Sequence, residues 1–314
     1  MKRVLVTGAA GSIGLFTIKY LLSEGKYEIT ALDLKNSGSY KRLKRYRRRI
    51  NIVYGDVTDP ILMDALVKDH DYIIHLAGVM PPLGDLKREL CKLIDYKGTE
   101  NIIRSISFFN PDCYLIYPSS TTIYGKKQDG VTVKSKVNIL DSEYYSNTKA
   151  EIEKMIKNKI KNYTIFRLPI VLANPKTEKF IYNGLRDEFV EVVTNRDVAY
   201  ALVRAIDYDK TLKGKIYNVG GGESCTTTYR ELLINVLEIH GLSFSYLLCK
   251  LFLDKNYYGH TYKDSDKLEE IIHFRNDSLA SYYMRLKRSS KGRTLNKFLA
   301  KPFIWVLKRQ EKGE

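Results

Sequence analysis

KRVLVTGAAGSIG, residues 2–14, joins a short apolar run to a turn that contains three glycines. The run is rich in valine and leucine, as expected of a strand that is buried on both faces of a sheet. Gly8, Gly11 and Gly14 follow with G-x-x-G-x-x-G spacing, and the apolar periodicity of residues 13–25 then predicts a helix. Glycines at such a turn let a pyrophosphate approach the backbone, and the helix N-terminus favours its charge. The stretch therefore predicts a dinucleotide-binding unit, with a structural turn that binds no ligand as the alternative.

The same alternation of short apolar strands and amphipathic helices continues through the first half of the chain. Further strands are expected at 28–34, 50–57, 71–78, 113–120 and 163–169, and helices at 61–69, about 86–107 and about 145–159. This order predicts an α/β fold of the Rossmann type, a doubly wound parallel sheet with helices on both faces. After Pro169 the pattern loosens, with strands expected at 189–193 and 215–219 and helices at 196–206 and 228–241.

These elements predict three parts of the chain. We expect a dinucleotide-binding Rossmann domain over 1–168, with later segments around 194–219 packing back on it. A small interleaved C-terminal substrate lobe is expected over 169–290, and a basic amphipathic tail over 291–314.

Asp33 ends the second expected strand, about twenty residues after the glycines. A carboxylate at this place can accept hydrogen bonds from both hydroxyls of an adenosine ribose and would repel a 2′-phosphate. It therefore favours NAD over NADP, while an Asp that only opens a turn is the plain alternative. Lys35 and the basic run that begins at Lys41 could reach a 2′-phosphate and are the argument for NADP.

The stretch SEYYSNTKAE (142–151) places Tyr145 and Lys149 four residues apart, so on a helix they lie on one face. A cation beside a phenol favours the phenolate, which makes a tyrosine a plausible base near neutral pH. Tyr144 points elsewhere. Because the chain has 24 Tyr and 52 Lys plus Arg, this spacing also arises by chance, and an ordinary surface helix is the alternative.

A series of motifs, in order over residues 1 to about 275, resembles the extended short-chain dehydrogenase/reductases of the NAD-dependent sugar epimerase/dehydratase family. The glycine turn and Asp33 are the first of them. The others are GDVTD (55–59), HLAG (75–78), DYKGTENII (95–103), YPSSTTIYG (117–125), YSNTK (145–149), FRLPIV (166–171), TNRDVAYAL (194–202), YNVGGGESCTTTYREL (217–232) and DSDKLEEIIHFR (264–275).

The resemblance implies NAD as the cofactor and a nucleotide sugar as the small-molecule substrate. It implies that Ser120 hydrogen-bonds the sugar hydroxyl, that Tyr145 takes its proton, and that Lys149 binds the nicotinamide ribose and lowers the pKa of Tyr145. The residues that it assigns to the cofactor are Gly8, Gly11, Ser12, Ile13, Gly14, Asp33, Asp56, Val57, Leu76, Ala77, Gly78, Tyr145 and Lys149. Those expected at the substrate are Thr121, Thr122 and Arg186; no metal site is expected, and His75 is expected to pack without a proton-transfer role.

Two departures from the family pattern bear on the reaction. The family's 4,6-dehydratases carry Asp-Glu directly after the serine, where this chain has Thr121 and Thr122. Because neither can act as a carboxylic acid, oxidation and reduction at one carbon is favoured, most simply C4 epimerisation through a transient keto intermediate. The alternatives are an NAD(P)H-dependent keto-sugar reductase, a dehydrogenase of a non-sugar alcohol such as a sterol, and a non-catalytic cofactor-sensing protein. Asp95 stands where the family has Asn.

The net charge of +16 is concentrated in two segments, KRLKRYRRR (41–49) and the tail from Arg285 to Glu314. We expect a solvated face for the first, and no nucleic-acid binding, because aromatic residues do not alternate with the charges. The tail mixes Lys and Arg with Leu, Phe and Trp, which suits contact with a membrane surface or a partner. A terminal helix packed on the body, or disorder, is the alternative for the tail.

The four scattered cysteines and the strand at residue 2 predict a cytoplasmic protein, peripheral to the membrane if the tail attaches there. The resemblance also implies a homodimer, built through the helix that carries Tyr145. Ile152, Met155 and Ile156 form an apolar stripe on that helix, which could serve such an interface or face the protein's own core.

Overall fold

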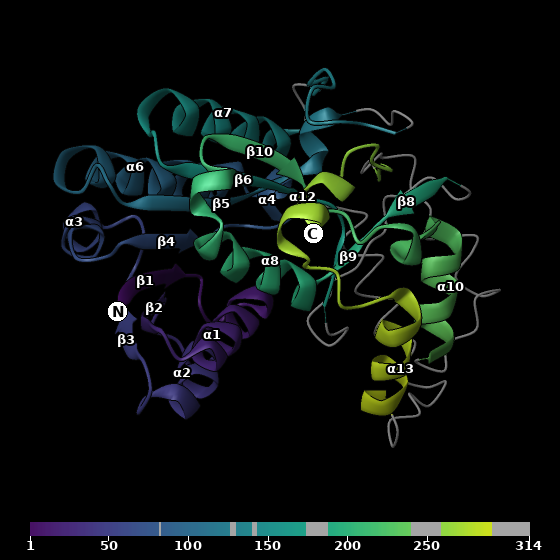
Figure 1. Ribbon diagram of the computed structural model, residues 1–314, viewed down its shortest axis with the longest axis horizontal. Coiled ribbons are helices and arrows are strands. Elements are labelled where there is room, and N and C mark those ends of the chain that lie inside the picture. Colours follow the sequence, from purple (N-terminus) through teal and green to yellow (C-terminus); the bar gives the residue numbers. More distant parts are fainter. Residues whose placement is uncertain (82, 126–129, 140–142, 174–187, 240–258, 291–314) are drawn as a thin grey trace.

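The structure, a computed structural model, describes the chain apart from residues 82, 126–129, 140–142, 174–187, 240–258 and 291–314. Its centre is one sheet of seven parallel strands in the order β10-β6-β5-β4-β1-β2-β3 (Figure 1). The strands are β1 (Lys2–Thr7), β2 (Tyr27–Asp33), β3 (Asn51–Tyr54), β4 (Tyr72–His75), β5 (Tyr114–Ser120), β6 (Tyr163–Leu168) and β10 (Lys215–Asn218). Helices separate consecutive strands, so the predicted Rossmann-type doubly wound sheet is confirmed.

Helices cover both faces of this sheet (Figure 1). On one face lie α1 (Ser12–Glu24) and α8 (Asn195–Asp207), which pack against each other and bury Ile18 and Leu202. On the other face lie α3 (Pro60–Lys68), α6 (Gly98–Phe109) and α7 (Tyr144–Lys159). The stripe of Ile152, Met155 and Ile156 on α7 is buried in this second core. Each such fully buried side chain contributes roughly 1.5–3 kcal/mol, so the stripe serves the protein's own core.

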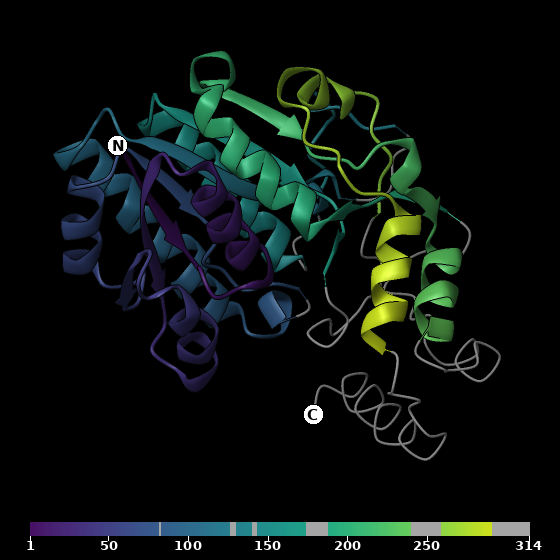
Figure 2. The ribbon, with the colours of Figure 1, turned by 60° about the horizontal axis from the view of Figure 1, so that its bottom comes forward.

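A third, smaller core lies beyond the carboxyl edge of the sheet. Here β8 (Phe189–Glu191) pairs antiparallel with β11 (Thr226–Thr228), and β7 (Val171–Leu172) pairs with β9 (Val193–Thr194). The helices α10 (Tyr229–Ile239) and α13 (Leu279–Ser290) pack side by side over them (Figure 2). Val190, Leu232 and Tyr282 belong to this core. Between its segments the chain returns to the sheet as α8 and β10, and α12 (Asp266–Ile272) packs against both.

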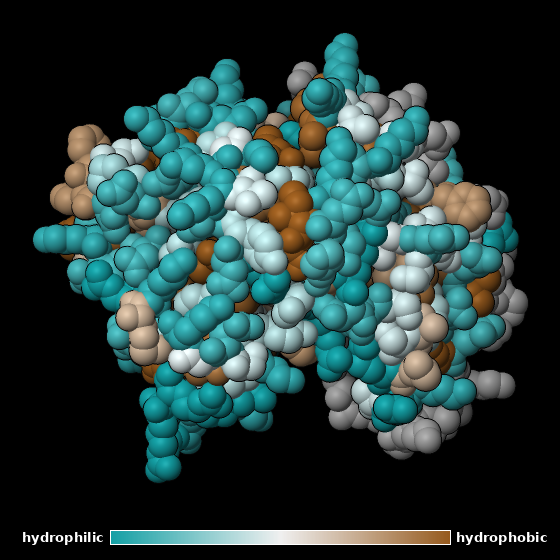
Figure 3. Space-filling model, viewed as in Figure 1, coloured by the Kyte–Doolittle hydropathy of each residue, from teal (hydrophilic) through white to brown (hydrophobic). Residues whose placement is uncertain are grey.

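The remaining elements are short. They are α2 (Ser37–Leu43), the 3-10 turns at Lys44–Tyr46, Thr121–Tyr124 and Glu223–Cys225, α4 (Leu83–Leu86), α5 (Arg88–Cys91), the π-helix η2 (Lys92–Lys97) and α9 (Asp209–Leu212). The basic run 41–49 lies on α2 and the turn that follows, and all seven of its cations are exposed. The surface around α2, at the lower left of Figure 3, is hydrophilic. The expected solvated face is confirmed.

The helix expected at about 86–107 differs in detail, because three segments replace it: α5, η2 and α6. The Thr99 hydroxyl donates to the Asp95 carbonyl, and the Asp95 side chain accepts a hydrogen bond from the backbone N–H of Val79, 2.7 Å away. Such side-chain contacts compete with regular helix bonds, and here they accompany the π-turn.

None of the helices in the described part of the chain has the length and apolar character that crossing a bilayer requires.

Candidate active site

The glycine turn lies where the strand order of the sheet reverses, between the carboxyl ends of β1 and β4. Gly8 has a φ of 62°, and a Cβ there would lie 2.7 Å from the backbone nitrogen of Ala77. A Cβ on Gly14 would lie 2.6 Å from the Gly8 carbonyl oxygen. These contacts hold the turn tightly between the two strands. Gly11 and Ser12 stay exposed at the N-terminus of α1, while Ile13 is half-buried.

This turn fits the pyrophosphate of a dinucleotide. The Gly11 N–H donates to the Gly8 carbonyl over 3.0 Å and closes the turn, so the positive end of the 13-residue helix α1 starts at the exposed Ser12. Larger residues at Gly8 and Gly14 would push the helix away from the sheet. Backbone packing therefore requires glycine at positions 8 and 14.

Asp33 lies at the end of β2, beside the same turn. Its Oδ2 accepts a hydrogen bond from the Ala10 N–H over 2.8 Å, and its side chain stays partly exposed. The Arg42 Nη1 donates to the Ala10 carbonyl over 2.9 Å, so a guanidinium from α2 lies on the other side of that residue. The basic run therefore reaches the turn through Arg42, a residue that the sequence pattern did not single out from its neighbours.

The loop after β3 and the end of β4 complete this edge. Asp56 Oδ1 accepts from the Thr58 N–H over 2.9 Å, and Asn101 donates to the carbonyls of Val57 and Thr58. Val57 is buried and packs where Gly98 leaves room for it.

Leu76 and Ala77 are half-buried after β4, and Gly78 is exposed. His75 is fully enclosed between the Thr7 and Thr99 hydroxyls, at 2.7 and 3.0 Å. Burial lowers the pKa of His75 to about 3, with the Lys149 charge acting in the same direction. The imidazole therefore stays neutral, and the expected packing of His75 without proton transfer agrees with this position.

Ser120, Tyr145 and Lys149 meet at the carboxyl end of β5. Ser120 ends this strand, and α7 carries the tyrosine and the lysine one turn apart, with the Lys149 Nζ 5.5 Å from the Tyr145 ring centroid. All three residues are at most 8% exposed. The pKa of Tyr145 is raised to about 12 because burial outweighs the lowering effects of the Lys149 charge and a hydrogen bond with Ser120.

Lys149 has two further partners that lie outside the sequence motif of Tyr145 and Lys149. Its Nζ donates to the Tyr117 hydroxyl over 3.0 Å and lies 3.0 Å from Asp95 Oδ1. Burial opposes the charged form of Lys149, but Tyr117 and Asp95 raise its pKa well above the usual value. These two partners therefore favour the charged form of the lysine. In the sequence, these two partners are marked only by Asp95, which stands where the family has Asn, and by Tyr117 at the start of YPSS.

Of the expected substrate residues, Thr121 and Thr122 follow Ser120 directly. Thr122 donates from its hydroxyl to the Ser120 Oγ over 3.0 Å, and Thr121 is 3% exposed. Arg186 lies outside the described residues. Arg275, another cation near the third core, donates to the Gly220 carbonyl and to Ser265, so local partners occupy it.

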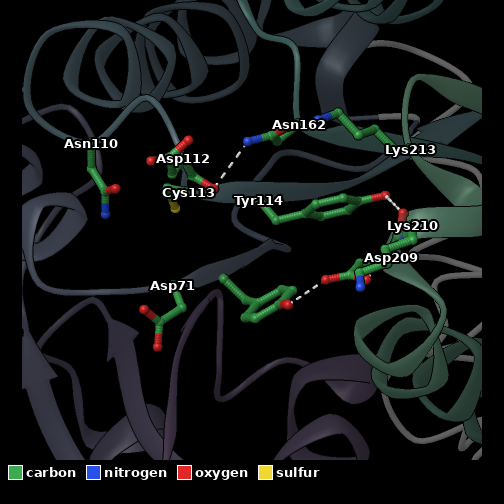
Figure 4. A pocket seen from close by; sticks show the side chains of 10 residues that line it. Asp71, Asn110, Asp112, Cys113, Tyr114, Asn162, Asp209, Lys210 and Lys213 are labelled. Carbon is green, nitrogen blue, oxygen red and sulfur yellow. Dashed lines mark hydrogen bonds between the residues drawn. The ribbon is translucent and has the colours of Figure 1, made fainter.

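A cavity of about 240 Å³ lies at the amino ends of the strands, lined in part by Tyr72, Tyr114 and Asp209 (Figure 4). Both tyrosine hydroxyls donate to Asp209, to its carboxylate and its carbonyl at 2.5 and 3.1 Å. Ser120 and the glycine turn lie at the carboxyl ends instead. This cavity is therefore separate from the candidate active site.

A doubly wound parallel sheet with a glycine turn at its switch point and a Ser–Tyr–Lys cluster at the same edge defines an extended short-chain dehydrogenase/reductase. The model of the NAD dependent epimerase/dehydratase family matches residues 4–220, and the chain belongs to this family of enzymes, whose cofactor is NAD.

Individual relatives and structures agree with this assignment. UDP-glucose 4-epimerase of Yersinia enterocolitica is 29% identical over 166 residues, 49% of this chain and 48% of that protein. A dTDP-glucose 4,6-dehydratase of Mycolicibacterium smegmatis is 30% identical over 170 residues, 52% of this chain and 50% of that protein. The chain thus spans about half the length of these two curated relatives. The crystal structure of UDP-glucuronic acid 4-epimerase from Bacillus cereus, with UDP-glucuronic acid and NAD, has a TM-score of 0.73 at 19% identity and covers 91% of this chain and 99% of its own. This last likeness concerns the fold.

Proposed function

We propose that this protein oxidises and re-reduces one hydroxyl-bearing carbon of a nucleotide sugar, most simply as a C4 epimerase with a transient keto intermediate. The observation that carries the proposal is the convergence of Ser120, Tyr145 and Lys149, all nearly buried, at the edge of the sheet that holds the glycine turn. The relatives named above that act on nucleotide sugars support the substrate class.

The three side chains have separate roles in this proposal. Ser120 donates a hydrogen bond to the reacting hydroxyl and orients it toward Tyr145. Tyr145, as the phenolate, takes the hydroxyl proton and returns it after the sugar has turned. Lys149 stabilises that phenolate and holds the ribose next to the reacting carbon. NAD, when bound, supplies hydride acceptance and donation.

The same residues support the assignment of the cofactor site. Gly8, Gly11, Ser12, Ile13 and Gly14 would hold the pyrophosphate, and Asp33 the adenosine ribose. Asp56 and Val57 would border the adenine, and Leu76, Ala77 and Gly78 the nicotinamide half. Arg42 is the residue most able to meet a 2′-phosphate, so an Arg42→Ala variant that binds NAD unchanged but loses residual NADP binding would support its assignment.

Water elimination is disfavoured in this proposal because Thr121 and Thr122 stand where a dehydratase needs two carboxylic acids. Both threonines are instead proposed to border the sugar. We further propose that the protein divides at about residue 168 into a cofactor domain and a small substrate lobe. A homodimer and contact of the 291–314 tail with a membrane surface also remain proposals.

The test starts with mass spectrometry of the nucleotide released from the denatured protein, where retained NAD is expected. The NAD-loaded protein is then incubated with UDP-glucose, UDP-glucuronic acid and UDP-N-acetylglucosamine, and the 4-epimers are measured by NMR. Tyr145→Phe should lower the rate by roughly 10²–10⁴-fold, whereas Tyr144→Phe, its half-buried neighbour, should leave it unchanged. Full activity of Tyr145→Phe would refute the role of this tyrosine. Net reduction of a keto sugar, without epimerisation, would establish the reductase instead.

A further inference from the structure

Asp95 forms a buried ion pair with Lys149. The distance from Nζ to Oδ1 is 3.0 Å, and the two side chains are 9% and 0% exposed. Oδ1 accepts no well-aligned hydrogen bond within the described chain, so charge attraction to the ammonium holds it. In a poorly solvated site the attraction between the two charges is larger than on a surface, and removing one partner leaves the other charge buried and uncompensated.

The backbone fixes the Asp95 carboxylate in this position. Its Oδ2 accepts from the Val79 N–H over 2.7 Å, and its Oδ1 would lie 2.8 Å from a Cβ on Gly78. The π-helix η2 carries Asp95 one turn before Gly98, where the chain packs tightly on Val57. π-turns are rare and frequently occur at functional sites. The carboxylate therefore has little freedom to turn away from Lys149.

The pair changes the electrostatic environment of Tyr145. On its own helix, Lys149 favours the phenolate, and from β5 Ser120 does the same. Asp95 on η2 and Cys91 on α5 oppose the phenolate. The other groups nearby are the Tyr117 phenol on β5, neutral His75 on β4, and Asp85 on α4, which accepts from the Tyr145 backbone N–H at 2.8 Å.

We propose that Asp95 is a positioning residue, which anchors the Lys149 ammonium and offsets part of its charge, so that Tyr145 ionises at a higher pH than Lys149 alone would set. The inference rests on the proposed role of Tyr145 as the base. The proposal predicts that a carboxamide at position 95 would make Tyr145 a more acidic base, so that the Asp in this chain tunes the site.

The test is the ionisation of Tyr145 in the NAD-loaded protein. Tyrosinate absorbance is titrated with pH in the wild type and in Asp95→Asn, and each curve is corrected by subtraction of the same protein with Tyr145→Phe. Loss of the carboxylate should move the ionisation of Tyr145 to lower pH by about one pH unit. The pH at which turnover is half-maximal should move by a similar amount. The absorbance titration requires no turnover. Its outcome is therefore independent of the substrate and of the proposed epimerisation.

The matched control is Asp85→Asn, which removes a partly exposed carboxylate from the same tyrosine and should shift the ionisation much less. An unchanged or more alkaline ionisation in Asp95→Asn would overturn the proposal, even if the variant were less stable.

A second measurement applies if Asp95→Asn folds poorly. Lys149→Met leaves the Asp95 carboxylate buried without its cation, so the double variant Lys149→Met/Asp95→Asn should melt at a higher temperature than Lys149→Met alone. If the double variant melts lower, the ion pair is not the reason for the position of Asp95, and the proposal fails.

Discussion

Arg167 and Glu153 form a second buried ion pair, and breaking it should destabilise the protein strongly. Arg167 on β6 donates from Nε to Glu153 Oε1 over 3.0 Å and from Nη2 to Oε2 over 2.7 Å. The two side chains are 5% and 3% exposed. The Tyr124 hydroxyl accepts from Nη1 over 2.9 Å, so each of the three guanidinium nitrogens has a partner. Since Glu153 lies on α7, the pair also attaches the helix of Tyr145 and Lys149 to the sheet.

Glu153→Gln keeps the shape of the side chain but leaves the guanidinium charged and buried. The expected loss is about 3–5 kcal/mol of unfolding free energy. For 314 residues, an unfolding entropy of about 0.7 kcal/mol/K converts this into a melting temperature lowered by about 4–7 °C. Differential scanning calorimetry near neutral pH is the assay.

Two further variants decide whether charge is the cause. The double variant Glu153→Met/Arg167→Met removes both charges and should recover most of the loss. Glu100→Gln, which breaks the exposed pair with Lys97, should change the unfolding free energy by less than about 1 kcal/mol. A loss below about 1 kcal/mol in Glu153→Gln, or a double variant less stable than either single one, would refute the reasoning.

Other substitutions test backbone strain, the cofactor turn and a buried carboxyl. His273 is exposed and ends α12 with a φ of 50°, so His273→Gly should raise the unfolding free energy by about 0.5–1 kcal/mol in denaturant melts. The reverse change at the end of α1, Gly25→Ala, where φ is 67° and nothing crowds a Cβ, should lower it by about 1 kcal/mol. Gly8→Ala would place its Cβ against the backbone of Leu76 and Ala77 and should weaken NAD binding at least about tenfold in calorimetric titrations, a cost of about 1.4 kcal/mol. Equal affinity would contradict the assigned turn. Burial raises the pKa of Asp197 from 3.8 to about 6 in the folded protein, although two backbone N–H groups oppose this. Because the folded pKa is the higher one, the stability from this group is present below pH 4 and is lost as pH rises through 6. The unfolding free energy of Asp197→Asn relative to the wild type should therefore rise by about 2–3 kcal/mol over that interval.

The sequence predicts the sheet well because its strands are short, apolar and separated by helices of clear periodicity. The glycine turn was also predictable, because glycines at the spacing of Gly8 and Gly14, between a strand and a helix, indicate a tight turn. Tyr145 and Lys149 could be chosen from many tyrosines and lysines only because neighbouring motifs occur in the family's order.

The partners of those side chains could not be predicted in the same way. Asp95 is 54 residues before Lys149 in the numbering, and the π-turn that aims it inward depends on contacts with Val79 and Thr99. Periodicity assigns this segment to a regular helix, because a single extra residue in a turn barely changes the apolar pattern. Arg42 was likewise indistinguishable from the six other cations of its run until α2 placed it beside Ala10.

The π-helix at Lys92–Lys97 bears on how related sequences could change in length by one residue. A π-turn bonds each residue to the fifth along, so it holds one residue more than α-helix of the same path. Deleting one residue here, such as Leu93, which is 51% exposed, could restore a regular helix with little damage to the core. The deletion would nevertheless rotate Asp95 away from Lys149. A one-codon length change, far from any motif glycine, would thus alter the charge balance of the site while the fold stays intact.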